Sequence, residues 1–108
     1  MRLPFLVARA EGLSMWPALR PGDILVIRRA SRPPRPRDIV VVHRPDRPGL
    51  LVTKRVVRRE RRGWWLEGDN PGHSDDSRVF GAVPDKLVVG RVVWRIRPRR
   101  GRRIPRPR

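Results

Sequence analysis

The chain carries the stretch GLSMWPALRPGDILVI at residues 12–27. Its last part, Ile24–Ile27, is a continuous apolar run rich in branched side chains, which predicts a buried strand. Pro17 and Pro21 exclude a long helix before that strand, so the segment after Ser14 is expected to be a turn that opens a short helix. A strand-rich chain with little helix follows from this stretch.

Short apolar runs broken by turn residues continue on both sides of this stretch. With 13 prolines and 9 glycines, the chain favours short strands and many turns over long helices. The further expected strands are Leu3–Glu11, Ile39–Val42, Leu50–Val57, Gly63–Glu67 and Leu87–Trp94. The sequence therefore predicts a mainly β domain at residues 1–97, followed by a basic Arg/Pro tail at residues 98–108 that is too poor in apolar surface to fold.

The composition limits the classes of function. At 108 residues, 38% of them hydrophobic, the chain makes one domain with a modest core, and it has no cysteine for disulfides or thiolate ligands. The net charge of +17 raises nucleic acid or an anionic membrane surface as partners. The arginines are spread through proline-containing turns, so solvated surface is the favoured interpretation and nucleic acid is not the expected partner.

The N-terminal apolar piece is too short for a membrane span. Leu3–Ala8 contains Pro4 and is followed by Arg9, so neither a transmembrane segment nor a secretory leader is expected. A cytoplasmic location follows as an expectation. The sequence does not define an oligomeric state.

Ser14 and Lys54 form the candidate catalytic pair. A serine hydroxyl needs a base within hydrogen-bond reach, and lysine can be that base only when it is neutral. Burial among apolar side chains achieves this by disfavouring the ammonium form. Leu50–Val57 supplies apolar neighbours to Lys54, whereas Lys86 stands in a polar turn. Arginine stays charged and cannot act as a base. Ser14 and Lys54 together therefore predict a serine endopeptidase with a Ser/Lys dyad.

Five short motifs, in one order over most of the chain, resemble the catalytic boxes of the signal peptidase family. They are Gly12-x-Ser14-Met15-x-Pro17-x-Leu19, Arg20-Pro21-Gly22-Asp23, Arg37-Asp38 before Ile39–Val42, Lys54-Arg55-Val56-Val57, and Gly68-Asp69-Asn70 with Ser74-x-Asp76-Ser77-Arg78-x-x-Gly81. The resemblance implies a compact catalytic core of short antiparallel strands, with Ser14 as nucleophile and Lys54 as base. It also implies that Ser74 orients the lysine and that Asp76 and Arg78 pair to brace the site.

Gly12 and Arg37 depart from the family pattern. Some members carry a serine two positions before the nucleophile, whose hydroxyl assists the oxyanion. With Gly12 there, backbone N–H groups, including that of Ser14, must do this work. Arg37 stands in place of the usual glycine. The family's membrane anchor and large inserted subdomain are missing from the sequence, so a soluble minimal core acting on a cytoplasmic protein is expected.

Within that family, the compact form resembles the nickel-type superoxide dismutase maturation proteases. The Trp64-Trp65 pair before Glu67–Asn70 and the ending Val89–Arg95 carry this resemblance. Those enzymes remove an N-terminal leader so that the new terminal amine joins the nickel site. The resemblance implies a precursor with an N-terminal leader as partner, first of all the nickel superoxide dismutase precursor, with another leader as the alternative.

The strands that flank the dyad are the expected substrate-binding elements. Residues 7–11 of one strand lead into Ser14 and residues 50–53 of the other lead to Lys54, so an extended substrate can add between their edges as a further strand. The expected substrate-binding residues are Val7, Ala8, Arg9, Ala10, Glu11, Met15, Trp16, Leu51, Val52 and Thr53.

Other readings stay open at this point. A basic β-domain could bind nucleic acid by stacking bases on its tryptophans, which are Trp16, Trp64, Trp65 and Trp94. Self-cleaving repressors share the Ser/Lys chemistry, but they carry a helix-turn-helix domain for which residues 1–11 leave no room. His43 and His73 have no carboxylate or thiolate at metal-ligand spacing, so neither a metal site nor a cofactor is expected.

Overall fold

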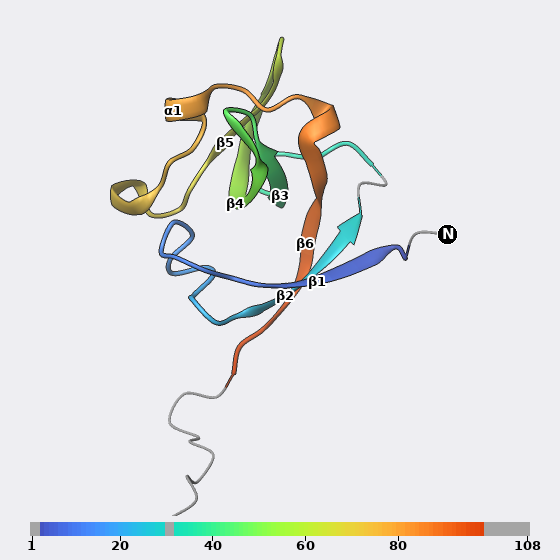
Figure 1. The fold of residues 1–108 in the computed structure, drawn as a ribbon, viewed down its shortest axis with the longest axis vertical. Helices are drawn as coiled ribbons and strands as arrows, with labels where there is room; N and C mark the ends of the chain where they lie inside the picture. Colours follow the sequence, from blue (N-terminus) through green and yellow to red (C-terminus); the bar gives the residue numbers. More distant parts are fainter. Residues whose placement is uncertain (1–2, 30–31, 99–108) are drawn as a thin grey trace, which may run out of the picture.

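One antiparallel sheet organises the chain, as the computed structural model shows for residues 3–29 and 32–98 (Figure 1). The strand order is β1-β2-β6-β3-β4-β5. The strands are β1 (Phe5–Arg9), β2 (Ile24–Arg29), β3 (Ile39–Arg44), β4 (Arg47–Glu60), β5 (Gly63–Glu67) and β6 (Val88–Ile96). The helical elements are the helix α1 (Ser77–Phe80) and the 3-10 turns η1 (Pro71–His73) and η2 (Asp85–Leu87). The predicted mainly β class is confirmed.

The strand β3 lies at the centre of the packing. Val40, Val41 and Val42 are all buried, because β3 has β6 on one side and β4 on the other and is covered on both faces. Successive side chains of a strand point to opposite faces. Val40 and Val42 accordingly join a cluster with Val56 and Leu66, and Val41 joins a second cluster. The second cluster also holds Met15, Leu19, Leu25 and Ile27.

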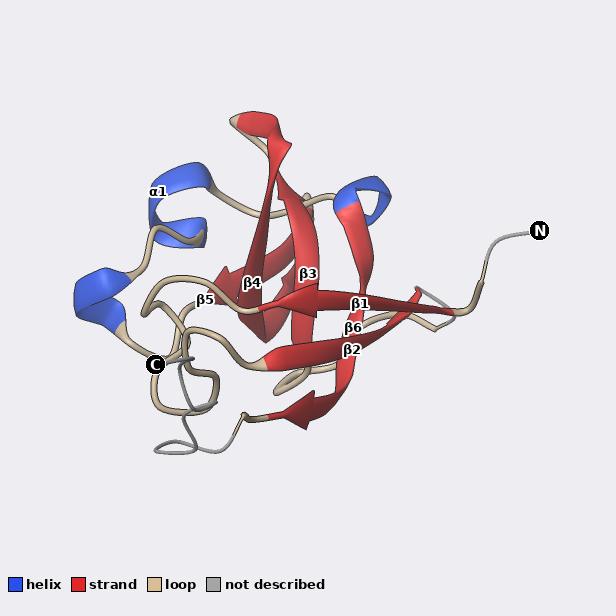
Figure 2. Cartoon of the chain, turned by 60° about the horizontal axis from the view of Figure 1, so that its bottom comes forward, coloured by secondary structure: helices blue, strands red, loops and turns tan. Residues whose placement is uncertain are grey.

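The strand β6 joins the two parts of the sheet. It pairs with β2 on one edge and with β3 on the other, so it carries the β1–β2 hairpin against the β3–β4–β5 meander (Figure 1). Gly90 permits this close pairing, because a Cβ at that position would collide with the carbonyl of Arg28. In a second view, α1 and η1 lie together to one side of the strands, near β5 (Figure 2).

The segment after Ser14 forms turns in place of the predicted short helix. One hydrogen bond with α-helical spacing closes this segment, from the Leu19 amide to the Met15 carbonyl at 2.9 Å. Pro17 has no amide hydrogen to donate, and Pro21 ends the segment, so the turn cannot propagate. It still buries Met15 and Leu19 in the core.

The strand β4 is longer than the predicted Leu50–Val57. It runs on to Glu60, because the charged side chains at its end lie along neighbouring aromatic rings. The Arg58 guanidinium lies 4.9 Å from the Trp65 ring, and that of Arg59 lies 4.8 Å from the Trp64 ring. Such stacking lets arginine occupy a strand without losing its contact with water.

The end of the described chain is anchored to the start of β2. The Arg97 guanidinium donates two hydrogen bonds of 3.0 Å to the carboxylate of Asp23, which is 1% exposed. Of the predicted tail at residues 98–108, Pro98 is described, and residues 99–108 lie outside the described residues. Among the residues that the structure does describe, no helix is long and apolar enough to span a membrane.

Candidate active site

The turn after β1 presents Ser14. Gly12 adopts φ of +71°, a left-handed conformation that glycine takes at little cost, and this redirects the chain out of β1. The Ser14 carbonyl accepts a 2.9 Å hydrogen bond from the Asn70 amide, so the backbone of Ser14 is tied to the segment that follows β5. The Ser14 amide donates to no other residue in the described part of the chain. An N–H group next to the serine hydroxyl is therefore available to a ligand.

Lys54 is buried in β4 with 4% of its surface exposed. It lies opposite Val40 of β3, so its aliphatic stem runs beside the valine-rich core. Burial lowers the pKa of the Lys54 amine below its ordinary value, and the charges of Arg44 and Arg78 lower it further. The carboxylates of Asp76 and Asp75 oppose this trend without reversing it. The neutral amine is favoured more than in an exposed lysine.

Ser14 and Lys54 line the same pocket of about 370 Å³. Residues 8–12 form one wall and residues 51–54 of β4 form another, while core side chains such as Met15 close its floor. The strand β1 is at the edge of the sheet, and β4 pairs with β5 only from Arg55 onward. Both walls thus offer strand edges that no described strand covers.

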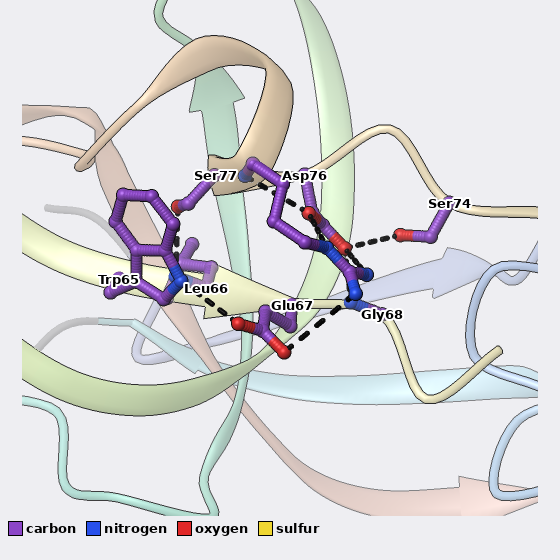
Figure 3. Close-up of polar contacts among 8 residues, drawn as sticks. Trp65, Leu66, Glu67, Gly68, Ser74, Asp76 and Ser77 are labelled. Atoms are coloured by element: carbon purple, nitrogen blue, oxygen red, sulfur yellow. Dashed lines mark hydrogen bonds and ion pairs between the residues drawn. The ribbon is translucent and has the colours of Figure 1, made fainter. Parts of the chain in front are cut away.

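A polar network behind Lys54 centres on Asp76, whose side chain is fully buried (Figure 3). The Ser74 hydroxyl donates to the Asp76 carboxylate at 2.9 Å, and the Gly68 amide donates to it at 2.9 Å. The Arg78 guanidinium donates to both carboxylate oxygens, at 2.9 and 2.6 Å. Burial alone would raise the pKa of Asp76, but these donors hold it at about 2. The carboxylate stays ionised and fixes the direction of the Ser74 hydroxyl.

Further contacts brace this network against β5. Arg78 also approaches Glu67, which accepts a 2.9 Å bond from the Trp65 indole, and the Ser77 hydroxyl accepts from the Leu66 amide (Figure 3). A Cβ at Gly68 would collide with the Ser74 hydroxyl and the Ser14 carbonyl. The loop between β5 and α1 is therefore packed tightly between the network and the serine turn.

The structure brings most of the predicted residues together. Ser74 and Lys54 line a common hollow of about 550 Å³, and Asp76 and Arg78 form the expected ion pair. Eight of the ten expected substrate-binding residues line the pocket that holds Ser14 and Lys54. They are Ala8, Arg9, Ala10, Glu11, Met15, Leu51, Val52 and Thr53.

Val7 and Trp16 lie outside this pocket. Val7 lies in the middle of β1 with 70% of its surface exposed to solvent. Trp16 follows Met15 directly, and since Met15 turns into the core, Trp16 lies on the other side of the turn, under the Arg20 guanidinium. The two residues were expected at the pocket because the sequence gives their position along the chain but not the side that each one faces.

Arg44 and Asp75 lie near Lys54 without having been predicted there. Both line the hollow that Lys54 and Ser74 share, and their charged groups are 3.5 Å apart. Arg44 follows a register shift at the end of β3, so its place relative to Lys54 depends on a bulge that the sequence pattern does not mark. Asp75 is the unspecified position within the motif Ser74-x-Asp76, and this place in the sequence is the one signal that points to it.

The tryptophans do not form the stacking surface that nucleic-acid binding requires. Trp64 is 7% exposed, and its indole donates to Asp85. Arginine guanidinium groups cover the rings of Trp16 and Trp65. Trp94, at 66% exposed, is the one open ring of the four. A single open ring does not make a platform for successive bases.

Residues 4–93 match the Peptidase S24-like family. Subunit 1 of the mitochondrial inner membrane protease of Xenopus tropicalis is 53% identical over 34 residues, which are 32% of this chain and 20% of that protein. Subunit 2 of the Danio rerio protease is 36% identical over 116 aligned residues, 82% of this chain and 63% of that protein. The Arabidopsis thaliana mitochondrial ATP-independent inner membrane protease subunit 1b is 35% identical over 118, covering 85% and 70%.

The distant homology to inner membrane protease subunits supports the expected signal-peptidase-like character in its general form. The narrower resemblance to nickel-type superoxide dismutase maturation proteases stays a prediction. So does the cytoplasmic location, since the relatives are named as inner membrane proteins. The match over residues 4–93, together with the Arabidopsis relative, shows that the chain belongs to the Peptidase S24-like family.

Proposed function

We propose that the chain is a serine endopeptidase that removes an N-terminal leader from a precursor protein, with Ser14 as nucleophile and Lys54 as general base. The observation that carries the proposal is the shared pocket: a serine hydroxyl and a buried lysine with a lowered pKa lie in it between two open strand edges. Membership of a peptidase family agrees with this reading.

In the acylation step, the neutral Lys54 amine takes the Ser14 proton while the serine oxygen attacks the scissile carbonyl carbon. The Ser14 amide donates to the resulting oxyanion. The ammonium of Lys54 then gives its proton to the leaving amine, and the C–N bond breaks to leave an acyl ester on Ser14. Water, deprotonated by the same amine, hydrolyses the ester and regenerates the serine.

Ser74 has the role of orienting the base. Its hydroxyl hydrogen is committed to Asp76, so its oxygen lone pairs are left to accept a hydrogen from the Lys54 amine. A lysine held by an acceptor presents its own lone pair in one direction. This is the direction that proton transfer from Ser14 requires.

The substrate segment before the cut would bind as an added strand. The Ala10 amide donates to the Asp23 carbonyl, and the Pro4 carbonyl accepts from the Arg29 amide. The backbone N–H and C=O groups of the even-numbered residues of β1 therefore point towards β2. The backbone groups of Val7 and Arg9 therefore point to the open edge, by the alternation of antiparallel pairing. In β4, the Val56 amide donates to Asp38, so Leu51 and Thr53 turn their backbone groups outward in the same way.

The precursor we propose is that of nickel superoxide dismutase. What supports this choice is the resemblance of the Trp64-Trp65 pair and the Val89–Arg95 ending to the proteases that mature this enzyme. Another leader peptide is the alternative substrate of the same chemistry. With the nickel superoxide dismutase precursor as substrate, we place the site of action in the cytoplasm.

The test is incubation of the purified chain with the nickel superoxide dismutase precursor, followed by mass measurement of the product. We expect loss of the leader, and no loss with Ser14→Ala or Lys54→Arg, because alanine has no nucleophile and guanidinium stays charged. Lys86→Arg is the matched control, since it makes the same change at an exposed lysine.

Circular dichroism and thermal unfolding must show that the inactive variants are folded. An active Lys54→Arg protein would overturn the role of Lys54. Cleavage of other leaders but not of this precursor would overturn the choice of substrate alone. If no precursor is cut and the wild type behaves as Ser14→Ala does, the peptidase proposal is wrong.

A further inference from the structure

A second hollow lies on the far side of the turn that presents Ser14. Its volume is about 610 Å³, and it is lined by Leu13, Trp16, Arg20, Asp23 and Arg97, with Pro21, Gly22 and Pro98 beside them. The bond from the Leu19 amide to the Met15 carbonyl makes the turn one helical turn long. Met15 and Leu19 therefore face the core, while Trp16 and Arg20, each one position later, face this hollow.

Arg20 brings a positive charge to this hollow without a matching carboxylate. Its guanidinium lies 4.7 Å from the centre of the Trp16 ring, and its Nε is buried with no hydrogen-bond partner among the described residues. No carboxylate of the described residues forms an ion pair with it. The nearby Asp23 is already occupied, because it accepts from the Arg97 guanidinium and from the Arg20 amide.

The position of Arg20 is fixed before any ligand arrives. The stacking on Trp16 holds the guanidinium, and the 2.8 Å bond from its own amide to Asp23 holds the backbone. Since the Nε is buried, a ligand would meet the two terminal nitrogens, and a guanidinium fixed in this way is suited to bind a carboxylate through two parallel hydrogen bonds from them. Leu13 and Trp16 add apolar walls, so the hollow fits an acidic side chain on a peptide better than a free small anion.

The two hollows lie on opposite sides of one nucleophile turn. Ser14 lines the pocket between the strand edges, and its neighbour Leu13 lines the second hollow. A peptide whose segment before the cut lies between β1 and β4 must pass Ser14 and leave over this turn. The first few residues after the cut, each spanning at most about 3.5 Å, then come to Trp16 and Arg20.

We propose that Arg20, stacked on Trp16, binds an acidic side chain within the first four residues after the cut and so selects precursors whose mature part begins with an acidic segment. The inference rests on the proposed peptidase function and adds a specificity site to it. The selecting charge is local to this hollow and distinct from the net charge of +17 that the whole chain carries.

The first experiment is cleavage of a proteome-derived peptide library, with the cut sites identified by mass spectrometry. We expect Asp and Glu to be enriched at one of the first four positions after the cut. For a matched peptide pair with Asp or Asn at that position, we expect kcat/KM to favour Asp about tenfold. Arg20→Gln should reduce this ratio to about one.

Arg62→Gln is the matched control, because it removes one positive charge at an exposed position in the turn between β4 and β5. It should keep the tenfold ratio, which separates the local site from the overall charge. A wild type without acidic enrichment, or an Arg20→Gln variant that keeps the ratio, would overturn the inference.

A binding measurement covers the case in which no peptide is cut. Fluorescein-labelled twelve-residue peptides, with Asp or Asn at each of four central positions, are titrated into the Ser14→Ala protein. We expect one Asp peptide to bind about tenfold tighter than its Asn partner, and the difference to vanish when Arg20→Gln is added. Such binding without cleavage in the wild type would overturn the peptidase proposal and keep the acidic site. Equal binding of all pairs would overturn the site.

Discussion

Replacing the buried carboxylate of Asp76 should remove a pH-dependent part of the stability of the fold. The pKa of Asp76 is lowered from its ordinary value of 3.8 to about 2. Because the folded value lies below the unfolded one, the stabilisation is complete above pH 3.8 and is lost as the pH falls towards 2. At about 1.36 kcal/mol for each pKa unit, the ionised group contributes about 2 kcal/mol at pH 7 and roughly half of that at pH 3.

The assay is urea unfolding of the wild type and of Asp76→Asn at both pH values. Urea is preferred to guanidinium chloride because it adds no salt that would screen the ion pair. Asn keeps the shape of the side chain but loses its charge. The stability gap between the two proteins should therefore shrink by about 1 kcal/mol between pH 7 and pH 3.

The matched control is Asp46→Asn. Asp46 also bonds an arginine, Arg44, but it is 45% exposed, so its removal should change the pH dependence far less. If the gap between wild type and Asp76→Asn is the same at pH 7 and pH 3, the burial and ion pairing of Asp76 do not depress its pKa in solution. The claim that the network keeps the Asp76 carboxylate ionised with a lowered pKa would then be wrong.

Two further predictions concern the base. Ser74→Ala should lower kcat more than it lowers stability and should leave KM unchanged, because in the proposed role Ser74 orients Lys54 without touching substrate. Its loss also removes one donor to the buried Asp76 carboxylate, and an unchanged kcat would contradict the role. Asp75→Asn should move the acidic limb of the kcat/KM profile to lower pH, since Asp75 raises the pKa of Lys54, and Arg44→Gln should move it to higher pH, since Arg44 lowers that pKa. If the acidic limb moves in the same direction in both variants, this electrostatic account is wrong.

The parts of the fold that the sequence predicts well are those set by local chemistry. The strand Gly63–Glu67 was predicted with its observed bounds, because a charged turn precedes it and Gly68 follows it. The ion pair of Asp76 with Arg78 lies within two residues, and the family motif marks it. In such cases the residues that determine the structure are neighbours along the chain.

The parts that the sequence does not predict depend on strand order. The pairing of Asp23 with Arg97 joins positions 74 residues apart, and it exists only because β6 lies between β2 and β3. Arg20 is one of many arginines in the chain, and only the packing of its turn shows that it stacks on Trp16 without a carboxylate partner. Long-range pairing is a property of the whole sheet, so a local pattern carries no sign of it.

The pairing of Asp76 with Arg78 eases a conflict between two electrostatic requirements of the proposed site. In the proposed mechanism a carboxylate fixes the Ser74 hydroxyl, yet a bare carboxylate near Lys54 would raise the pKa of the amine and favour its protonated form. Arg78 supplies a compensating charge that lowers the pKa of Lys54, while its guanidinium keeps Asp76 ionised. In the proposed role, Asp76 orients the Ser74 hydroxyl while Arg44 and Arg78 offset part of its effect on the pKa of Lys54. Burial, the largest influence on that pKa, favours the neutral amine.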